Sequence, residues 1–215
     1  MPIFGARGLN NGLADPMNIG WELGWVLAGR AGPALLDSYT PERRGATLDE
    51  FANASKSARF MTPPRHGWQV MRDAALSLDH DFAGHLANPR QMTPYVYAES
   101  AVVRADDPGF AGGAAAGDVL PDAPFGGGFL SDRMGPGFAV LCFDSGLARA
   151  LGGVAGEGLR VLLLPPTSDP ARRLAAGAGS ACLLRPDLYI AARWHRARAE
   201  HVIAAYRAAI CKRAE

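Results

Sequence analysis

The chain has 215 residues, of which 48% are hydrophobic, and its formal net charge at pH 7 is +1. This composition supports one substantial core or two small ones, and the near-neutral charge argues against a nucleic-acid partner held by bulk electrostatics. The cysteines, Cys142, Cys182 and Cys211, have no CxxC or metal-ligand spacing, so we expect free buried thiols in a cytoplasmic protein. No signal peptide is apparent, and the apolar run from Met17 to Leu27 is too short to span a membrane.

The first predicted element is a glycine-rich turn, Phe4 to Gly12, that leads into the apolar run. Gly5, Gly8 and Gly12 have no Cβ, so the backbone there can bend tightly and approach a ligand closely. The amides that open the following helix have no partner within it and lie at the positive end of its dipole. The residues alone leave two interpretations open: a cradle for a phosphate, a carboxylate or an electron-rich ring, or a loop that only starts a helix.

The apolar run predicts a central, buried helix from about Asn10 or Asn11 to about Ala28. Pro16 conflicts with a straight helix, because inside a helix it removes a backbone hydrogen bond and clashes with the carbonyl four residues earlier. Either the helix kinks at Pro16, or it begins there with Asp15 as its N-cap.

Two further helices are expected to form, with the first, a small antiparallel cluster that packs against the missing flavin domain. Residues 33–39 predict short helical turns, and Thr40-Pro41 predicts the N-cap and first residue of a helix that ends near Met61. The face of this helix expected in the core consists of Leu48, Phe51, Ala54 and Ala58. A third helix runs from about Arg65 to Leu78, with apolar positions at Trp68, Val70, Met71, Ala75 and Leu78. Arg43 and Arg44 are interpreted as structural salt-bridge residues rather than ligand contacts.

From Phe82 to Gly117 the sequence predicts an extended connector, punctuated by proline and glycine, in which Tyr95 to Tyr97 adds an edge strand. The remainder alternates strands and helices. The expected strands are residues 129–131, 138–143, 159–164, 180–184 and 188–194, and the expected helices are residues 145–152 and 195–212. Residues 185–187 predict a turn between two antiparallel strands. A βαβ unit followed by a hairpin and a helix is the order of a thioredoxin-like fold, although the redox CxxC is absent.

Few side chains form a recognisable chemical constellation. His80 and His85 do not share one helical face, so metal binding by them is not expected. Ser38 and Ser145 have no paired histidine in view, and no G-x-S-x-G motif is present. The basic residues of the last helix predict a solvated face, with a phosphate-binding surface as the alternative. We therefore assign no catalytic residue and no metal ligand from the sequence.

Motifs along nearly the whole chain are similar to those of one known family. The first is Pro2-Ile3-Phe4-Gly5-Ala6-Arg7-Gly8-Leu9-Asn10, followed by Asp15, Asn18, Trp21 and Leu23. The others, in chain order, are Leu35-Leu36-Asp37-Ser38-Tyr39, Glu42-Arg43-Arg44, Met92-Thr93-Pro94-Tyr95, Gly117-Asp118, Pro121-Asp122-Ala123-Pro124, Leu184-Arg185-Pro186-Asp187 and Ala191-Ala192-Arg193-Trp194. Together they resemble the C-terminal portion of the FAD-dependent aromatic hydroxylases, the class A flavoprotein monooxygenases typified by phenol and 3-hydroxyphenylpropionate hydroxylases.

The resemblance implies roles for the residues at the start of the chain. The cofactor-binding residues that it implies are Pro2, Phe4, Gly5, Arg7, Gly8, Leu9 and Asn10. The amides of the last three would point at the edge of the isoalloxazine where negative charge grows on reduction. Pro2, Phe4 and Gly5 would lie beside the ring and the substrate pocket. The family usually has a second proline where this chain has Ile3, and alanine where it has Pro16.

Whole enzymes of this family, as the resemblance implies, use NADPH or NADH to reduce FAD and then hydroxylate an aromatic ring with oxygen. The G-x-G-x-x-G fingerprint and the acidic Gly-Asp motif of the FAD site do not occur in this sequence, so we do not expect tight FAD binding by the chain alone. We expect the C-terminal part of a monooxygenase acting on a phenolic or polyketide-like substrate, completed by a chain that supplies the missing FAD-binding part or present as a homodimer. The alternative is a non-catalytic thioredoxin-like interaction or dimerisation module with a vestigial flavin loop.

The expected fold is therefore α+β followed by α/β. Residues 1–90 would form the flavin-edge loop and helical segment of an incomplete FAD-binding domain, residues 91–116 an extended linker, and residues 117–215 a thioredoxin-like domain lacking CxxC. An incomplete chain would expose the apolar helix from Met17 to Leu27, so we also expect self-association or poor solubility.

Overall fold

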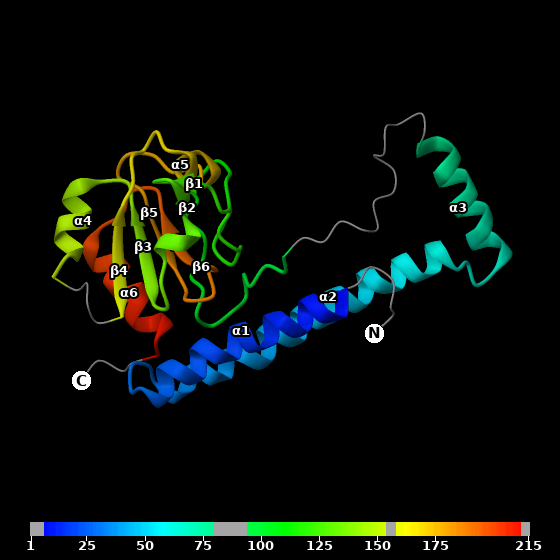
Figure 1. Ribbon diagram of the computed structural model, residues 1–215, viewed down its shortest axis with the longest axis horizontal. Helices are drawn as coiled ribbons and strands as arrows, with labels where there is room; N and C mark the ends of the chain where they lie inside the picture. Colours follow the sequence, from blue (N-terminus) through cyan, green and yellow to red (C-terminus); the bar gives the residue numbers. More distant parts are fainter. Residues whose placement is uncertain (1–6, 80–93, 154–157, 212–215) are drawn as a thin grey trace. The chain divides into compact units, whose positions relative to one another are not determined.

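The computed structural model describes residues 7–79, 94–153 and 158–211, and the chain divides into two compact units (Figure 1). Unit 1 consists of Met1–Pro16 and Arg43–Tyr95, and unit 2 of Met17–Glu42 and Val96–Glu215. Each unit is thus built from two separate stretches of the sequence. The expected division into residues 1–90, 91–116 and 117–215 remains a prediction.

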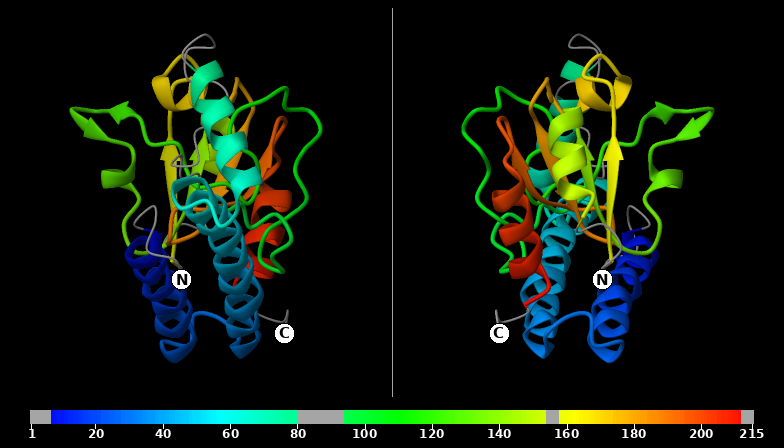
Figure 2. Two further views of the ribbon diagram at one scale, coloured as in Figure 1. Left: turned by 90° about the vertical axis from the view of Figure 1, so that its right-hand side faces the viewer. Right: turned by 90° about the vertical axis from the view of Figure 1, so that its left-hand side faces the viewer.

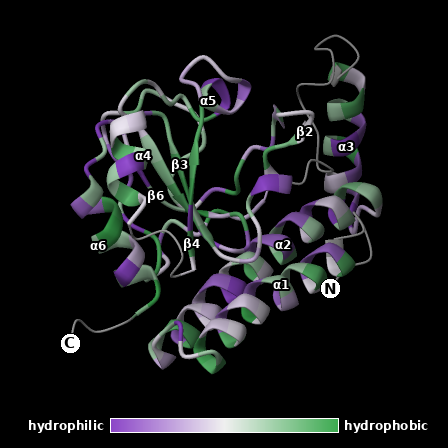
Figure 3. Cartoon of the chain, turned by 60° about the vertical axis from the view of Figure 1, so that its left-hand side comes forward, coloured by the Kyte–Doolittle hydropathy of each residue, from purple (hydrophilic) through white to green (hydrophobic). Residues whose placement is uncertain are grey.

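The first helix, α1, runs from Arg7 to Leu27 and continues through Pro16. It begins before Asn10, so the prediction of a start at Asn10 or Asn11 and the alternative of a start at Pro16 are both wrong. The prediction of a buried helix is also wrong for much of α1, since Met17 is 62% exposed and Leu27 83% exposed. The side chains of Asn18 and Glu22 are buried instead. Figure 3 shows how apolar and polar residues alternate along α1.

Three more helical segments follow: the 3-10 helix η1 (Pro33–Ser38), α2 (Tyr39–Met61) and α3 (His66–Asp79). Because α2 follows η1 without a break, the expected helix start at Thr40-Pro41 is wrong by one or two residues. The expected core face of α2 is confirmed at Ala54, whereas Leu48 and Phe51 are exposed. The apolar side chains of α3 are exposed at Trp68, Val70, Met71 and Leu78. The described part of unit 1 contains only helices, which leaves few elements to cover these side chains.

Unit 2 contains a four-stranded mixed sheet with the strand order β4-β3-β5-β6 (Figures 1 and 2). The strands are β3 (Phe138–Cys142), β4 (Leu159–Leu163), β5 (Ala181–Leu184) and β6 (Ile190–Trp194). β3 and β4 are parallel and are joined through α4 (Ser145–Leu151), while β5 pairs antiparallel with both β3 and β6. The expected βαβ unit and following hairpin are confirmed. The side chain of Asp144 caps α4 by accepting a hydrogen bond from the amide of Leu147 at 2.7 Å.

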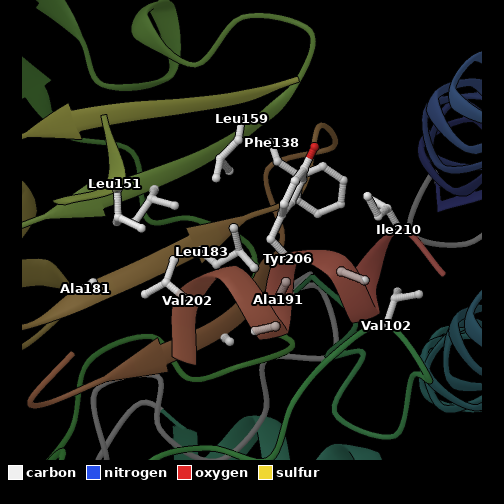
Figure 4. Close-up of a cluster of buried hydrophobic side chains, with 14 of the residues drawn as sticks. Val102, Phe138, Leu151, Leu159, Ala181, Leu183, Ala191, Val202, Tyr206 and Ile210 are labelled. Carbon is white, nitrogen blue, oxygen red and sulfur yellow. The ribbon is translucent and has the colours of Figure 1, made fainter. Parts of the chain in front are cut away.

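Both faces of β3 are buried, so its side chains alternate between two hydrophobic clusters. Phe138 and Val140 belong to the first cluster, with residues of α4 and of α6 (Ala199–Ala209) (Figure 4). Ala139 and Leu141 belong to the second, with residues near η2 (Ser131–Arg133) and α5 (Asp169–Arg173). This double burial matches the continuous apolar sequence of the strand.

Two tryptophans of α1 attach this helix to the sheet. The rings of Trp21 and Trp25 lie 5.5 and 5.2 Å from the ring of Phe138, both in edge-to-face geometry. At Gly158 a Cβ would lie 2.6 Å from the ring of Trp25, and the φ of this residue is +85°, so glycine is required there on both counts. The second half of α1 is therefore an integral part of unit 2.

The remaining local predictions succeed only in part. The short strands β1 (Pro124–Phe125) and β2 (Gly128–Phe129) form a hairpin, and η2 occupies Ser131, so the expected strand over 129–131 is wrong. The expected edge strand over 95–97 is also wrong, since these residues are in no strand. The sequence did not predict α5, and α6 is shorter than the expected 195–212. Among the described residues, no helix is long and apolar enough to cross a membrane.

Candidate functional site

The residues expected to contact a cofactor fall at the start of α1. Three of them, Pro2, Phe4 and Gly5, lie outside the described residues. The other four, Arg7, Gly8, Leu9 and Asn10, form the first turn of α1. Gly8, Leu9 and Asn10 are exposed, with Leu9 at 73%.

The chemistry of this first turn fits an electron-rich ligand. The first amides of a helix have no acceptor within it and carry the positive end of the helix dipole. No acidic residue lies in the first turn of α1 to neutralise that charge. No described residue outside the helix accepts a hydrogen bond from the amide of Gly8 or Leu9. The turn can therefore stabilise negative charge on a group that reaches it.

Within unit 1, Arg43 forms hydrogen bonds with the part of α1 that precedes Pro16. Its Nε donates to Asp15 Oδ1 at 2.6 Å, and its Nη2 donates to the carbonyl of Asn11 at 3.0 Å and to the Asn11 side chain. Asn11 Nδ2 also donates to Thr47 Oγ1 at 3.2 Å. The prediction that Arg43 forms a structural salt bridge is confirmed.

A second polar site, buried in unit 2, is centred on Arg185 in the turn between β5 and β6. The guanidinium donates to both carboxylate oxygens of Glu42, at 2.6 and 2.9 Å. It also donates to both oxygens of Asp187, at 3.0 and 2.6 Å. The Arg185 side chain is 0% exposed, that of Glu42 1% and that of Asp187 4%. Two carboxylates thus hold one cation that is withdrawn from water.

Aromatic rings complete the surroundings of this guanidinium. The Arg185 Cζ atom lies 5.3 Å from the ring centres of Trp21 and Tyr97 and 5.7 Å from that of Tyr189. Trp21 Nε1 also donates to Asp187 Oδ2 at 3.2 Å. A guanidinium can face aromatic rings favourably while its edge donates to carboxylates. The site therefore joins α1, the start of α2 and the β5–β6 turn.

The carboxylate of Glu42 is fully engaged. Besides Arg185, it accepts hydrogen bonds from Asn18 Nδ2 at 2.7 Å and from the hydroxyl of Ser100. Glu22 is different: its Oε1 lies 3.1 Å from Ser38 Oγ, and its Oε2 has no partner among the described residues. Burial, followed by the negative charge of Glu42, raises the pKa of Glu22 to about 7. We use the term Arg185 cluster for Asn18, Glu22, Ser38, Glu42, Ser100, Arg185 and Asp187.

A separate ion pair orders the segment that leads to β6. Arg193 donates to both oxygens of Asp106, at 2.6 and 2.5 Å, and its Cζ lies 4.2 Å from the ring centre of Phe110. The hydrogen bond from Arg193 holds the pKa of Asp106 below its usual range. This pair stabilises the connector by a long-range contact that the sequence alone does not reveal.

The described residues contain no group of three or more His, Cys, Asp and Glu side chains arranged to hold a metal ion. His80 and His85 lie outside the described residues. Cys142 and Cys182 are buried and free, and Cys211 is half-buried and free. Burial raises the pKa of both Cys142 and Cys182 to about 12, so their thiols are poor nucleophiles at neutral pH.

Residues 1–50 match the family model of an FAD binding domain. The chain is 30% identical over 172 residues to the 3-(3-hydroxy-phenyl)propionate/3-hydroxycinnamic acid hydroxylase of Mycolicibacterium smegmatis, covering 72% of this chain and 29% of that protein. The chain is a partial homologue of the FAD-dependent aromatic hydroxylases. A hydroxylase of the same name from Klebsiella pneumoniae is 36% identical over 73 residues, or 34% of this chain and 13% of that protein.

Solved structures show the same fold. Aklavinone-11 hydroxylase, in a complex with FAD and aklavinone, matches with a TM-score of 0.68 at 24% identity, covering 94% of this chain and 40% of that one. The rebeccamycin biosynthetic enzyme RebC, with reduced flavin, matches with a TM-score of 0.70 at 21% identity, covering 97% and 42%. The chain therefore has the fold of the C-terminal portion of the class A flavin monooxygenases. The chain spans less than a third of the length of the curated hydroxylases that it matches, for example 29% and 28% of two of them.

The sequence of this hydroxylase homologue did not predict the Arg185 cluster. Its members are spread between residues 18 and 187, and the Arg185-Pro186-Asp187 segment was interpreted only as a turn and as part of the family resemblance. One local signal was present: Asn18 and Glu22 are polar residues one turn apart in an otherwise apolar helix. Buried polar groups in such a segment need partners from elsewhere in the fold.

Proposed function

We propose that the chain is the C-terminal part of an FAD- and NAD(P)H-dependent monooxygenase that hydroxylates a phenolic or polyketide-like aromatic substrate. The observation that carries this proposal is the 30% identity over 172 residues to a hydroxylase of 3-(3-hydroxy-phenyl)propionate and 3-hydroxycinnamic acid. The FAD binding family match over residues 1–50 supports the cofactor.

The residues at the start of α1 have a defined role in this proposal. FAD, when bound, supplies the redox chemistry with oxygen. The amides of Gly8, Leu9 and Asn10 hydrogen-bond to the ring edge on which negative charge develops, and Arg7 adds positive charge nearby. By the family resemblance, Pro2, Phe4 and Gly5 would lie beside the ring and the substrate. The exposed first turn without an acidic side chain supports this arrangement.

The partner of this chain is the remainder of an FAD-binding domain. In unit 2, α1 presents an exposed face without a charged side chain, made of Met17, Gly20, Leu23, Gly24 and Leu27. A face of this kind in a water-exposed helix is typical of an interaction surface. At Gly20 and Gly24 a Cβ would meet nothing within 4 Å, so this face is open to a close approach. The remainder is supplied by the same polypeptide or by another chain.

A thioredoxin-like domain over residues 117–215 is also part of the proposal. The βαβ unit, the antiparallel hairpin and the closing helix α6 support it. The second candidate function for the chain is a non-catalytic interaction or dimerisation module with a vestigial flavin loop. It is favoured by the burial of Cys142 and Cys182, which leaves the sheet without a reactive thiol among its described residues.

FAD titration of the purified chain, followed by flavin fluorescence, tests the proposal. We expect weak binding, because the chain supplies only part of the contacts. Binding of this kind should be lost in Gly8→Leu, whose side chain would fill the space beside the first-turn amides. It should be kept in the matched control Gly12→Leu, since a Cβ at Gly12 meets nothing within 4 Å.

Each outcome of this titration has a distinct meaning. Sub-micromolar binding by the chain alone would contradict the proposal that it is an incomplete FAD site. Equal binding by Gly8→Leu and Gly12→Leu would refute the residue assignment. A coding sequence upstream of Met1 that encodes an in-frame G-x-G-x-x-G segment would identify the remainder of the domain in the same polypeptide. A stop codon there would favour a separate chain or the second candidate function.

A further inference from the structure

The Arg185 cluster holds more acidic groups than cations. One guanidinium, Arg185, shares a water-excluded site with three carboxyl groups, those of Glu22, Glu42 and Asp187. Arg185 gives two hydrogen bonds to Glu42 and two to Asp187. None of the described hydrogen bonds joins it to Glu22. An ionised Glu22 would therefore be a buried charge without a bonded cation, which is strongly unfavourable.

The hydrogen atoms around Ser38 lead to the same conclusion. Ser38 Oγ lies 2.7 Å from the carbonyl oxygen of Leu35 and 3.1 Å from Glu22 Oε1. A hydroxyl has only one hydrogen to donate, and the shorter distance assigns it to the carbonyl. The contact between Ser38 and Glu22 then needs a hydrogen from the carboxyl group of Glu22.

Two acceptors in the cluster also lack a donor. Asn18 Oδ1 and Glu22 Oε2 are buried and have no hydrogen-bond partner among the described residues. The amide nitrogen of Asn18 already donates to Glu42 at 2.7 Å, so the orientation of the amide leaves its oxygen as the orphan. Asn18 and Glu22 lie four residues apart, on one face of α1. The one proton of a Glu22 carboxylic acid serves the contact with Ser38 Oγ, and it makes Glu22 uncharged at a site where Oε2 has no donor among the described residues.

We propose that Glu22 is a neutral carboxylic acid in the folded protein and that loss of its proton above neutral pH weakens the attachment of α1 to the rest of unit 2. The groups that face Glu22 are Glu42 at the start of α2, Arg185 and Asp187 from the β5–β6 turn, and Cys211 after α6. The thiol of Cys211, whose pKa is also raised by burial, keeps its proton in this range.

The direction of the pH effect follows from the two states of Glu22. The folded protein holds the proton with a pKa of about 7, against 4.5 for the free side chain. The stabilisation is fully present below the unfolded pKa and is lost as the pH rises through about 7. Between pH 5 and pH 8 these two values correspond to a decrease of roughly 70-fold in the folding equilibrium constant. This inference does not depend on flavin chemistry.

Urea unfolding of the full chain at pH 5 to pH 8 tests the proposal. The wild-type protein should lose stability across this range relative to Glu22→Gln, whose neutral amide can donate to Ser38 Oγ without titrating. The matched control Glu99→Gln removes an exposed carboxylate and should keep the wild-type dependence. Because the comparison is a difference between variants, the titration of histidines and other carboxylates cancels.

Infrared spectroscopy of the native protein provides a measurement that does not depend on a substituted cluster. The absorption of a protonated carboxylic acid should be present at pH 6 and lost by pH 8.5, and it should be missing at pH 6 in Glu22→Gln. A parallel pH dependence of wild type and Glu22→Gln would overturn the proposal. The proposal would also be overturned if stability at pH 8 rose with Na⁺ or K⁺ concentration and did not depend on protonation. A cation bound to the unpartnered oxygens of Asn18 and Glu22 would then explain the cluster.

Discussion

Replacing Arg185 by alanine should destabilise unit 2 by about 3–5 kcal/mol, the range seen when one partner of a buried ion pair is removed. The substitution leaves Glu42 and Asp187 in a site that excludes water and removes the four hydrogen bonds that they accept from the guanidinium. It also removes the contacts of the guanidinium with three aromatic rings, at 5.3 to 5.7 Å, each worth about 0.5–2 kcal/mol. The carboxylates will relax partly toward water, so we do not add the two contributions.

A loss of this size is easily measured against a typical domain stability of about 5–15 kcal/mol. Urea unfolding followed by tryptophan fluorescence is suitable, because Trp21 and Trp25 lie in unit 2 and change environment when α1 detaches. The urea concentration at the unfolding midpoint should be much lower for Arg185→Ala than for the wild type, with little change in the dependence of the unfolding free energy on urea concentration. Arg185→Lys should fall between alanine and wild type, because an ammonium keeps the charge but cannot form two paired hydrogen bonds with each carboxylate.

The matched control is Arg172→Ala, which removes an exposed arginine paired with Asp169. Surface pairs contribute about 0–1 kcal/mol, so this variant should unfold close to the wild-type midpoint. Two results would refute this reasoning. One is a free energy of unfolding of Arg185→Ala within about 1 kcal/mol of the wild-type value, and the other is an equal loss of stability in Arg185→Ala and Arg172→Ala.

Three further predictions concern other parts of the chain. Cys142 and Cys182 should resist a thiol reagent in the native protein, since burial raises the pKa of each to about 12; labelling as fast as in urea would contradict this. Asp106→Asn should lower stability at pH 7 by about 1 kcal/mol, after allowance for partial exposure to solvent. The lowered pKa of Asp106 means that its ion pair stabilises the fold fully above the pKa of the unfolded side chain, and that this stabilisation is lost as the pH falls. The variant should therefore lose less stability on acidification than the wild type. An acid unfolding curve that is the same for both would argue against the pair with Arg193. Leu27→Glu should reduce self-association, measured by sedimentation, and a wild-type chain that is already a clean monomer would refute the prediction.

The sheet of unit 2 was predictable because its signals are local. β3 and β4 are short apolar runs, and β4 is bounded by Gly158 and Pro165, so their length and burial follow from neighbouring residues. The Arg185-Pro186-Asp187 turn likewise separates two strands as expected. The sequence did not predict the antiparallel pairing of β5 with β3, which joins the βαβ unit to the hairpin across a long separation along the chain.

The burial of α1 was predicted wrongly because burial is not a local property. Met17 and Leu27 are apolar and were expected inside, but nothing in the described part of the chain covers them. Asn18 and Glu22 are polar residues of the same apolar run, yet they are buried, because Glu42 and Ser38 are their hydrogen-bond partners. The flavin-edge residues stay a prediction carried by the family resemblance, since the fold places only the later ones, at the first turn of α1.

The two units are interleaved along the chain, which crosses between them after Pro16, Glu42 and Tyr95. No single cut in the polypeptide therefore separates one unit from the other. A fragment that begins at residue 117 would keep every strand of the sheet but lose Trp25 from the surface of Phe138 and Glu42 from Arg185. Truncation from either end would thus remove part of the unit that it is meant to isolate. A chain in which residues 17–42 are joined to residues 96–215 through a short linker would keep all of unit 2.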